Sequence, residues 1–270
     1  RRIMHSPADP GAVETAPIFV SLSSFGASDV LRDGQARFVH LCHAAGADGV
    51  EIRGELLRSG DREIDELAPL IHEAGLTCVY SSPELLWDEG GNLNRQALDE
   101  GLARAAVLGA TILKMSTGRY GVASRGSLSA LQTSIHGRRS RLLIENDQTA
   151  SGGTVAALTR FFVDAGNAGL DLGMTFDMGN WHWAGECPQD AARQFAPRVR
   201  YVHCKGVQRQ PTRWIAVPLA DSLAPWRSIL RSLPADAPRA IEFPLVGEDL
   251  TQVTRLAVEG LRTEHTEAGS

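Results

Sequence analysis

The chain has 270 residues, of which 43% are hydrophobic and 22% are charged, and its formal net charge is −5. These values indicate a globular protein with a sizeable core, and the acidic balance argues against the basic stripe of a nucleic-acid-binding protein. No apolar run approaches the ~18 residues of a membrane span, so we expect neither nucleic acid nor a membrane as a partner.

The first 16 residues lack the apolar core of about 7–15 residues that a secretory signal requires, and we expect them to form a flexible leader. A single domain over residues 17–270 is predicted to follow. Eight apolar runs in this domain are typical of buried strands. They span residues 18–25, 49–53, 76–81, 111–116, 142–147, 172–177, 199–205 and 239–243.

Segments with helical periodicity lie between these strands and after the last of them. They span residues 36–45, 64–74, 98–108, 127–136, 154–165, 190–195, 226–233 and 250–262. Glycines that are typical of helix C-caps follow four of them. These are Gly46, Gly75, Gly109 and Gly166.

Regular alternation of strands and helices predicts an α/β fold in which parallel strands are joined by crossover helices. Eight such units in about 250 residues fit a single-domain (β/α)₈ TIM barrel. The main alternative is a doubly wound open sheet, which usually carries a glycine-rich turn after its first strand. No such turn follows residues 18–25, and we therefore predict the barrel.

The four cysteines lie far apart, and no two of them form a Cys-x-x-Cys pair. They are Cys42, Cys78, Cys187 and Cys204. This spacing excludes a zinc ribbon and makes a disulfide framework improbable in a domain of this size. We therefore expect a cytoplasmic protein.

Four of the predicted strands carry a residue that can bind a metal ion near their carboxyl ends. The residues are Glu145, Asp177, His203 and Glu242. Side chains alternate between the two faces of a strand, so neighbours of opposite parity face the helices. Those neighbours are all apolar, namely Ile144, Phe176, Val202 and Ile241. The pattern predicts one shared metal site at the carboxyl end of the barrel, where TIM-barrel active sites lie.

Three carboxylates and one imidazole favour Mn²⁺, Mg²⁺ or Co²⁺, with Zn²⁺ as an alternative and Ca²⁺ less suited. Such a cation leaves positions open for neighbouring oxygens of a hydroxy-ketone. It could then polarise the carbonyl and stabilise an enediolate, while an adjacent carboxylate takes the proton from the next carbon.

The same residues resemble the xylose isomerase-like barrels of the sugar isomerase/epimerase superfamily. The matching pieces, in order, are residues 49–53 (GVEIR), 144–146 (IEN), 176–180 (FDMGN), 202–206 (VHCKG) and 241–242 (IE), and the resemblance covers about residues 17–260. It implies that the four residues bind one divalent cation. It also implies that Glu145 and Glu242 are catalytic and exchange a substrate proton, and that Arg209 binds substrate.

The chain departs from the ketose epimerases at two substrate-binding positions. Their histidine three residues after the strand-six aspartate is replaced by Asn180, and the nearest histidine is His182. A second substrate-binding glutamate is replaced by Ser151, so the identity of the substrate does not carry over. Residues 21–26 (SLSSFG) and 80–83 (YSSP) also resemble an epimerase-like protein of bacterial 2-ketogluconate utilisation operons.

Other residues are candidates for binding a substrate, each with a structural alternative. Glu51 could contact a substrate hydroxyl or form an ion pair with Arg53. Lys114 lies inside a predicted strand, where it could bind an acidic or phosphorylated substrate or pair with Glu51 or Glu145, and Lys205 is similar.

Two connections are long enough to act as lids over the barrel, residues 82–93 with Trp87 and residues 206–225 with Arg209. Trp181 and His182 follow the strand-six aspartate directly. We predict Trp87, Trp181 and His182 as substrate contacts, with packing in the core as the alternative for the tryptophans.

These residues lead to the hypothesis of a metal-dependent isomerase or epimerase of a small keto-sugar or sugar acid. A dehydratase of the dehydroshikimate type and a sugar-binding barrel without turnover are the alternatives. A DNA-repair endonuclease is disfavoured because the chain lacks the extra histidines of that branch and is acidic. The expected partner is a small carbohydrate, and self-association in a homo-oligomer remains open.

Overall fold

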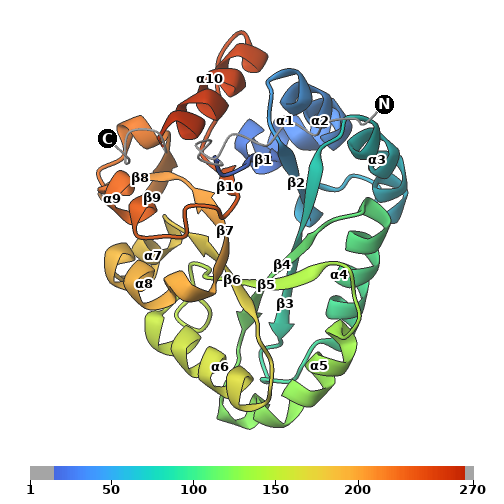
Figure 1. Ribbon diagram of the computed structural model, residues 1–270, viewed down its shortest axis with the longest axis vertical. Helices are drawn as coiled ribbons and strands as arrows, with labels where there is room; N and C mark the ends of the chain where they lie inside the picture. The colour runs from blue at the N-terminus through green and yellow to red at the C-terminus, as the bar shows by residue number, and fades with distance from the viewer. Residues whose placement is uncertain (1–14, 265–270) are drawn as a thin grey trace, which may run out of the picture.

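Eight parallel strands form a closed barrel in a computed structural model that describes residues 15–264 (Figure 1). Around the barrel the order is β1-β10-β7-β6-β5-β4-β3-β2. The strands are β1 (Ile18–Ser21), β2 (Gly49–Arg53), β3 (Thr77–Trp87), β4 (Ile112–Gly118), β5 (Arg141–Glu145), β6 (Gly173–Asp177), β7 (Val199–Cys204) and β10 (Arg239–Ile241). This closed order confirms the predicted (β/α)₈ barrel. The predicted leader lies outside the described residues, except for residues 15 and 16.

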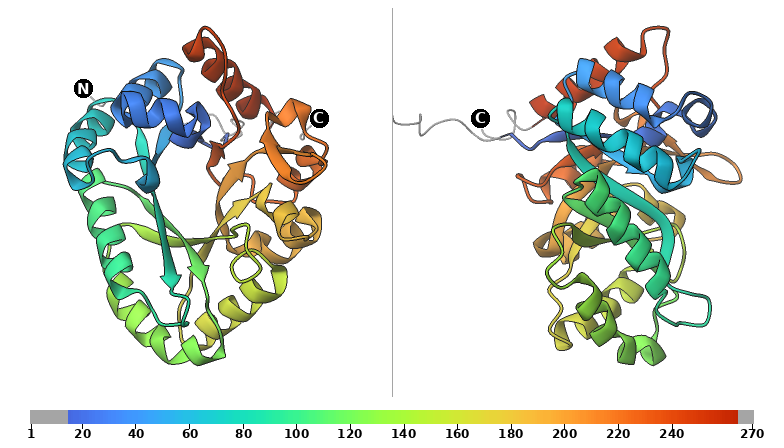
Figure 2. Two further views of the ribbon diagram at one scale, coloured as in Figure 1. Left: turned by 180° about the vertical axis from the view of Figure 1, so that it is seen from behind. Right: turned by 90° about the vertical axis from the view of Figure 1, so that its right-hand side faces the viewer.

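Helices surround the barrel in both views of the molecule (Figures 1 and 2). They are α1 (Ala27–Asp33), α2 (Gln35–Ala44), α3 (Asp61–Glu73), α4 (Arg95–Leu108), α5 (Leu128–Ile135), α6 (Val155–Asn167), α7 (Asn180–Trp183), α8 (Pro188–Phe195), α9 (Trp226–Arg231) and α10 (Leu250–Thr263). No helix within residues 15–264 is both long enough and apolar enough to span a membrane.

Every predicted helix is present, with shifts at its ends. Gly109 adopts a left-handed conformation with a φ of 65° and ends α4 as predicted. The predicted cap at Gly166 is wrong, because α6 continues to Asn167 and the left-handed glycine is Gly169, with a φ of 79°.

Two layers of apolar side chains separate the inside of the barrel from its helical shell. The inner cluster is Phe19, Val79, Ile112, Leu143, Tyr201 and Ala240. The larger outer cluster includes Ile144, Phe176, Val202 and Ile241, which confirms the parity predicted for these strands. The ligand-type residues of opposite parity are therefore directed to the inside of the barrel.

The segment after β7 is folded rather than a simple loop. Strands β8 (Gly206–Arg209) and β9 (Trp214–Val217) pair antiparallel, with Arg209 opposite Trp214. This hairpin takes the place of the predicted lid loop over residues 206–225. It follows directly on the strand that carries His203, so its base lies beside the predicted metal site.

Candidate metal centre

The ends of four strands bring the predicted ligands together. Glu145, Asp177 and His203 lie on β5, β6 and β7, and Glu242 directly follows β10; ligand atoms of the four residues lie within 4.8 Å of one another. Nδ1 of His203 lies 3.0 Å from Oε1 of Glu145, 2.9 Å from Oε2 of Glu242 and 3.5 Å from Oδ2 of Asp177. Parallel strands place their carboxyl ends at one rim, which explains this convergence.

Three of these ligand atoms are buried without a hydrogen bond: Oδ2 of Asp177, Nδ1 of His203 and Oε2 of Glu242. The side chains of Asp177 and His203 are 0% exposed, and that of Glu242 is 14% exposed. Buried polar atoms that make no hydrogen bond are costly, and these atoms face one another at ion-pair distances. Oxygen-rich donors with one imidazole fit a divalent cation.

A second hydrogen-bonded layer sets the orientation of His203. Oε2 of Glu51 lies 2.6 Å from Nε2 of His203 and accepts a 2.8 Å hydrogen bond from the hydroxyl of Tyr201. Its other oxygen accepts a 2.7 Å hydrogen bond from Nη1 of Arg53. Glu51 therefore favours the tautomer in which Nδ1 of His203 is free to bind a cation. Its side chain is 0% exposed behind His203 and forms the ion pair with Arg53 that was the structural alternative, so a contact of Glu51 with substrate stays a prediction.

Each of the two predicted catalytic carboxylates has one oxygen near a basic side chain. Nζ of Lys114 forms an ion pair with Oε2 of Glu145, and Nη1 of Arg53 lies 3.3 Å from Oε1 of Glu242. Burial opposes ionisation of Glu145, but Lys114 and His203 outweigh it and lower its pKa to about 2. His203 and the basic neighbours likewise hold the pKa of Glu242 well below its usual range. Lys114 thus forms the predicted pair with Glu145, and its contact with a substrate stays a prediction.

The chain directly after β6 orients Asp177. Its Oδ1 accepts 2.9 Å hydrogen bonds from the backbone N–H groups of Gly179 and Asn180. The side chain of Asn146 donates to the Asp177 carbonyl and accepts from its N–H, at 3.0 Å and 2.8 Å. Because Oδ1 is used in this way, Oδ2 is left to face the centre.

Lys205 lies at the open side of the centre. Its Nζ is 3.0 Å from Oδ2 of Asp177 and 3.0 Å from Oε2 of Glu242, and it donates a 3.2 Å hydrogen bond to Oδ1 of Asn180. Burial opposes its charge, but the two carboxylates raise the pKa of Lys205 above its usual value. The carboxylate pairing of Lys205 and the ion pair of Arg53 with Glu51 match alternatives predicted from the sequence, whereas the position of Tyr201 at the centre was not predicted. Tyr201 and Lys205 lie on the same face of their strand as His203, and Arg53 lies on the same face as Glu51, so strand alternation could have placed them near the centre.

The model of the xylose isomerase-like TIM barrel family matches residues 39–244, which is most of the chain. The protein belongs to this family. No curated protein sequence matches the chain. The suggested resemblance to a protein of 2-ketogluconate operons is not confirmed by these comparisons.

Solved structures with the same fold resemble this xylose isomerase-like barrel over nearly its whole length. A xylose isomerase domain protein from Alicyclobacillus acidocaldarius is 20% identical, with a TM-score of 0.63 and coverage of 93% of this chain and 99% of that chain. A D-allulose 3-epimerase from Methylomonas sp. is 13% identical, with a TM-score of 0.69 and coverage of 93% and 97%. A probable 3-DHS dehydratase from Bacillus anthracis is 13% identical, with a TM-score of 0.65 and coverage of 91% and 98%. At these identities the likeness shows the fold alone.

Trp87 does not face the centre of the xylose isomerase-like barrel. Strand β3 is longer than predicted and carries Trp87 into the helical shell, where it is 0% exposed. Its ring packs edge-on against Tyr120 and Phe161, with centroids 4.7 Å and 5.5 Å away, and its N–H donates to Ser127 at 2.9 Å. The prediction of Trp87 as a substrate contact is therefore wrong.

Trp181 is likewise a packing residue. It is 0% exposed and lies between Phe176 and Phe195, with ring centroids 5.4 Å and 5.9 Å away. Because Phe176 faces the helices, the ring of Trp181 is on the outer side of β6. The predicted sugar-stacking role of Trp181 is therefore wrong, and the packing alternative is correct.

His182 and Arg209 meet at the β8–β9 hairpin. The ring centroid of His182 lies 4.8 Å from that of Trp214, and Cζ of Arg209 lies 5.4 Å from the same Trp214 ring. Within residues 15–264, no hydrogen bond or ion pair joins either residue to the four ligands. Their roles in substrate binding remain predictions.

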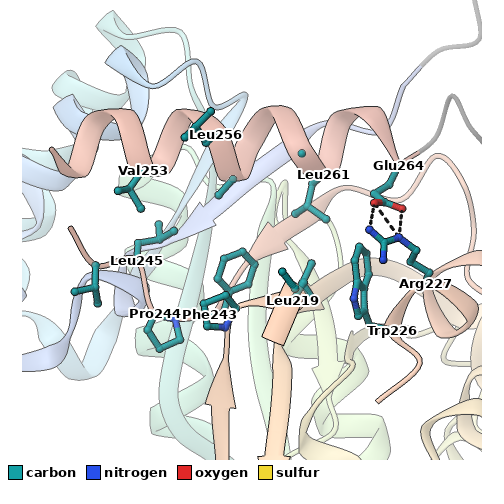
Figure 3. A pocket seen from close by; sticks show the side chains of 15 residues that line it. Leu219, Trp226, Arg227, Phe243, Pro244, Leu245, Val253, Leu256, Leu261 and Glu264 are labelled. Carbon is teal, nitrogen blue, oxygen red and sulfur yellow. Dashed lines mark hydrogen bonds and ion pairs between the residues drawn. The ribbon is translucent and has the colours of Figure 1, made fainter. Parts of the chain in front are cut away.

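A cavity of about 440 Å³ adjoins the centre. Lys205 and Glu242 line it together with Ser23 from the β1 side and Phe243 from the β10 side. A larger apolar cavity of about 610 Å³ lies under α10 and contains none of the predicted site residues (Figure 3). The smaller cavity is therefore the candidate for a substrate, because it reaches the polar atoms that can act on one.

The affinity of the xylose isomerase-like barrel for a divalent cation is expected to rise with pH. Burial opposes the charged form of His203, but Glu242, Glu51 and Glu145 outweigh it and raise its pKa well above 6.5. In the cation-free protein this proton stabilises the fold at low pH, and that stabilisation is lost as pH rises through the raised pKa. A cation must displace the proton, so affinity should rise about tenfold per pH unit while His203 is protonated.

Competition with a calibrated chelator for Mn²⁺ at several pH values would measure this dependence. His40, which lies on the exposed side of α2, provides a matched control in the variant His40→Gln. That variant should keep the pH dependence unchanged. An affinity for Mn²⁺ that does not vary with pH would contradict displacement of the His203 proton.

Proposed function

We propose that the protein is a divalent-cation-dependent isomerase or epimerase of a small keto-sugar or sugar acid. The observation that carries this proposal is the convergence of buried ligand atoms of Asp177, His203 and Glu242, none of which makes a hydrogen bond, beside Glu145. Solved structures of the same fold include proteins described as a D-allulose 3-epimerase and a D-psicose 3-epimerase, which supports this reaction class.

The cation would be held by Glu145, Asp177, His203 and Glu242. Mn²⁺, Mg²⁺ and Co²⁺ suit this set of three carboxylates and one imidazole, and Zn²⁺ is the alternative. When bound, the cation would supply a Lewis acid that polarises the carbonyl of the substrate.

Glu145 and Glu242 are proposed to move the substrate proton. They come from strands on different sides of β6 and β7, so they approach the centre from two directions. Both are held ionised by basic neighbours, as their lowered pKa values indicate, and an ionised carboxylate can accept a proton from a carbon beside a carbonyl. One carboxylate would take the proton and the other would return a proton to the opposite face or to the neighbouring carbon.

A dehydratase on the same scaffold is the second candidate. The fold of the probable 3-DHS dehydratase from Bacillus anthracis matches this chain with a TM-score of 0.65, which favours it over other lyases. Removal of a proton beside a carbonyl can lead to loss of water as readily as to isomerisation. The mass of the product separates the two reactions, because only the dehydratase product is lighter by one water.

Exchange of hydrogen with solvent tests the proposal. The protein, stripped of metal by a chelator and then reloaded with Mn²⁺, would be incubated in D₂O with a panel of ketoses and keto-sugar acids. We expect the reloaded protein to introduce deuterium into at least one of them, and the stripped protein to lose this activity. Mn²⁺ without protein is the control. Complete absence of exchange and of product across the panel would instead favour a sugar-binding barrel.

A further inference from the structure

Lys205 differs from the other basic residues of the centre in the atoms that it contacts. Its Nζ lies 3.0 Å from Oδ2 of Asp177 and from Oε2 of Glu242. These two oxygens belong to the proposed cation ligands, and their close charged neighbours are Lys205 and Nδ1 of His203. In the cation-free protein the ammonium group therefore supplies part of the positive charge that a divalent cation would bring.

Arg53 and Lys114 are not placed in the same way. Arg53 contacts Glu51 at 2.7 Å and Glu55 at 2.8 Å, and Lys114 is paired with Glu145. Arg53 uses Oε1 of Glu51, Lys114 uses Oε2 of Glu145, and the further contact of Arg53 with Glu242 is to Oε1 at 3.3 Å, not to the Oε2 that faces the centre. A cation at the centre would thus leave the partners of Arg53 and Lys114 in place, whereas it would take both partners of Lys205.

The stem of Lys205 is held while its end can reach open space. A Cβ atom added at Gly179 would lie 2.5 Å from Cγ of Lys205, so the stem packs directly on the Gly179 backbone. The side chain is 8% exposed and lines the cavity of about 440 Å³ that adjoins Glu242. A small rotation at the end of the stem would therefore move the ammonium group toward that cavity.

The balance of charge favours an anion there. Four carboxylates, none more than 14% exposed, surround the centre, and three basic side chains accompany them. The carboxylates are Glu51, Glu145, Asp177 and Glu242, and the basic residues are Arg53, Lys114 and Lys205. In the cation-free protein, with His203 protonated, the net charge of this group is about 0. A divalent cation that displaces the His203 proton raises it to about +1. Glu55 pairs with Arg53 at the rim, where solvent screens its 37% exposed side chain.

We propose that Lys205 binds the carboxylate of an anionic substrate once the cation has taken the oxygens of Asp177 and Glu242. This inference rests on the proposed function and selects a sugar acid over a neutral keto-sugar. Lys205 would hold the carboxylate in the cavity beside Glu242. An ammonium–carboxylate contact in such a sheltered position has the strength of a charge-assisted hydrogen bond.

Matched pairs of ligands test this role. D-Fructuronate carries a carboxylate where D-fructose carries a hydroxymethyl group. D-Tagaturonate and D-tagatose differ in the same way. Calorimetric binding to the Mn²⁺-loaded protein should favour at least one acid over its neutral partner by tenfold or more. Removal of Mn²⁺ should weaken binding of that acid, because Lys205 returns to Asp177 and Glu242.

The variants Lys205→Met and Lys205→Arg separate charge from shape. Lys205→Met should weaken binding of the acid by at least tenfold and leave the neutral ketose within about twofold, while Lys205→Arg should retain most of the preference. The Kd for Mn²⁺, measured directly, should be unchanged or lower in Lys205→Met, because a competing positive charge is removed.

Three outcomes would each overturn the inference. Lys205→Met could weaken binding of the acid and of the ketose equally, the unchanged protein could show no preference for an acid, or Lys205→Met could lose much of its Mn²⁺ affinity. Binding is measured without turnover, so the two proposals can fail separately. Selective binding of an acid without deuterium exchange would contradict the isomerase function and leave the role of Lys205 intact. Deuterium exchange without selective binding of an acid would support the isomerase function and contradict the role of Lys205.

Discussion

The variant Glu242→Gln is expected to lower the rate of deuterium exchange by about 10³-fold, within the range that general-base catalysis supplies. Glutamine keeps the shape of the side chain and an oxygen that can face His203, but an amide cannot accept a proton at neutral pH. The contact of 3.3 Å between Oε1 of Glu242 and Nη1 of Arg53 would also lose its charge. The rate should therefore fall much more than the occupancy of the cation.

Exchange rates and bound Mn²⁺ would be measured in parallel on the same preparations. Glu55→Gln is a matched control. Glu55 lies at the rim, 2.8 Å from Arg53, and has no contact with the ligand atoms. The variant removes the same charge from the same network and should change the exchange rate only slightly. If Glu242→Gln retained full exchange at normal Mn²⁺ occupancy, Glu242 would not be the group that moves the proton.

The variant Glu51→Gln is expected to weaken Mn²⁺ binding about 10–100-fold, although Glu51 would not touch the cation. Its carboxylate holds Nε2 of His203 at 2.6 Å and thereby keeps Nδ1 directed at the centre. An amide offers one accepting oxygen for both His203 and Tyr201. The charge of Arg53 also loses a partner 2.7 Å away, although its contacts with Glu55 and Glu242 remain.

Tyr201→Phe is the control for the effect of Glu51→Gln. It removes only the 2.8 Å hydrogen bond from the tyrosine hydroxyl to Glu51 and leaves the charge in place. Mn²⁺ affinity should fall by less than in Glu51→Gln, and thermal unfolding of the stripped protein should show a smaller loss of stability. Equal Mn²⁺ affinity in Glu51→Gln and the unchanged protein would show that the orientation of His203 does not depend on Glu51.

Periodicity along the chain was sufficient to predict the barrel and the side of each strand that faces inward. The apolar residues Ile144 and Phe176 alternate with Glu145 and Asp177, and a strand has only two faces. Closure of the barrel then brings the ends of β5, β6, β7 and β10 together without any further information. For these reasons the metal-binding cluster could be predicted from local sequence.

Contacts between distant strands could not be predicted in the same way. The hydrogen bond between Glu51 and His203 joins residues 152 positions apart, on strands that are not neighbours in the barrel. The length of residues 82–93 predicts a lid that carries Trp87, whereas β3 continues to Trp87 with a register shift between Ser81 and Leu85. Such irregular pairing depends on the neighbouring strand, which local sequence does not describe.

The positions of Lys205 and His203 also bear on how the protein would fold without a cation. A cluster of four inward carboxylates would repel itself in an empty barrel, but an ammonium group and an imidazolium proton already lie among them. The polypeptide can therefore close around this site before any metal arrives. Binding of a cation would then be a later step that displaces the His203 proton, and the cation bound would reflect which ions the surroundings supply to a folded barrel.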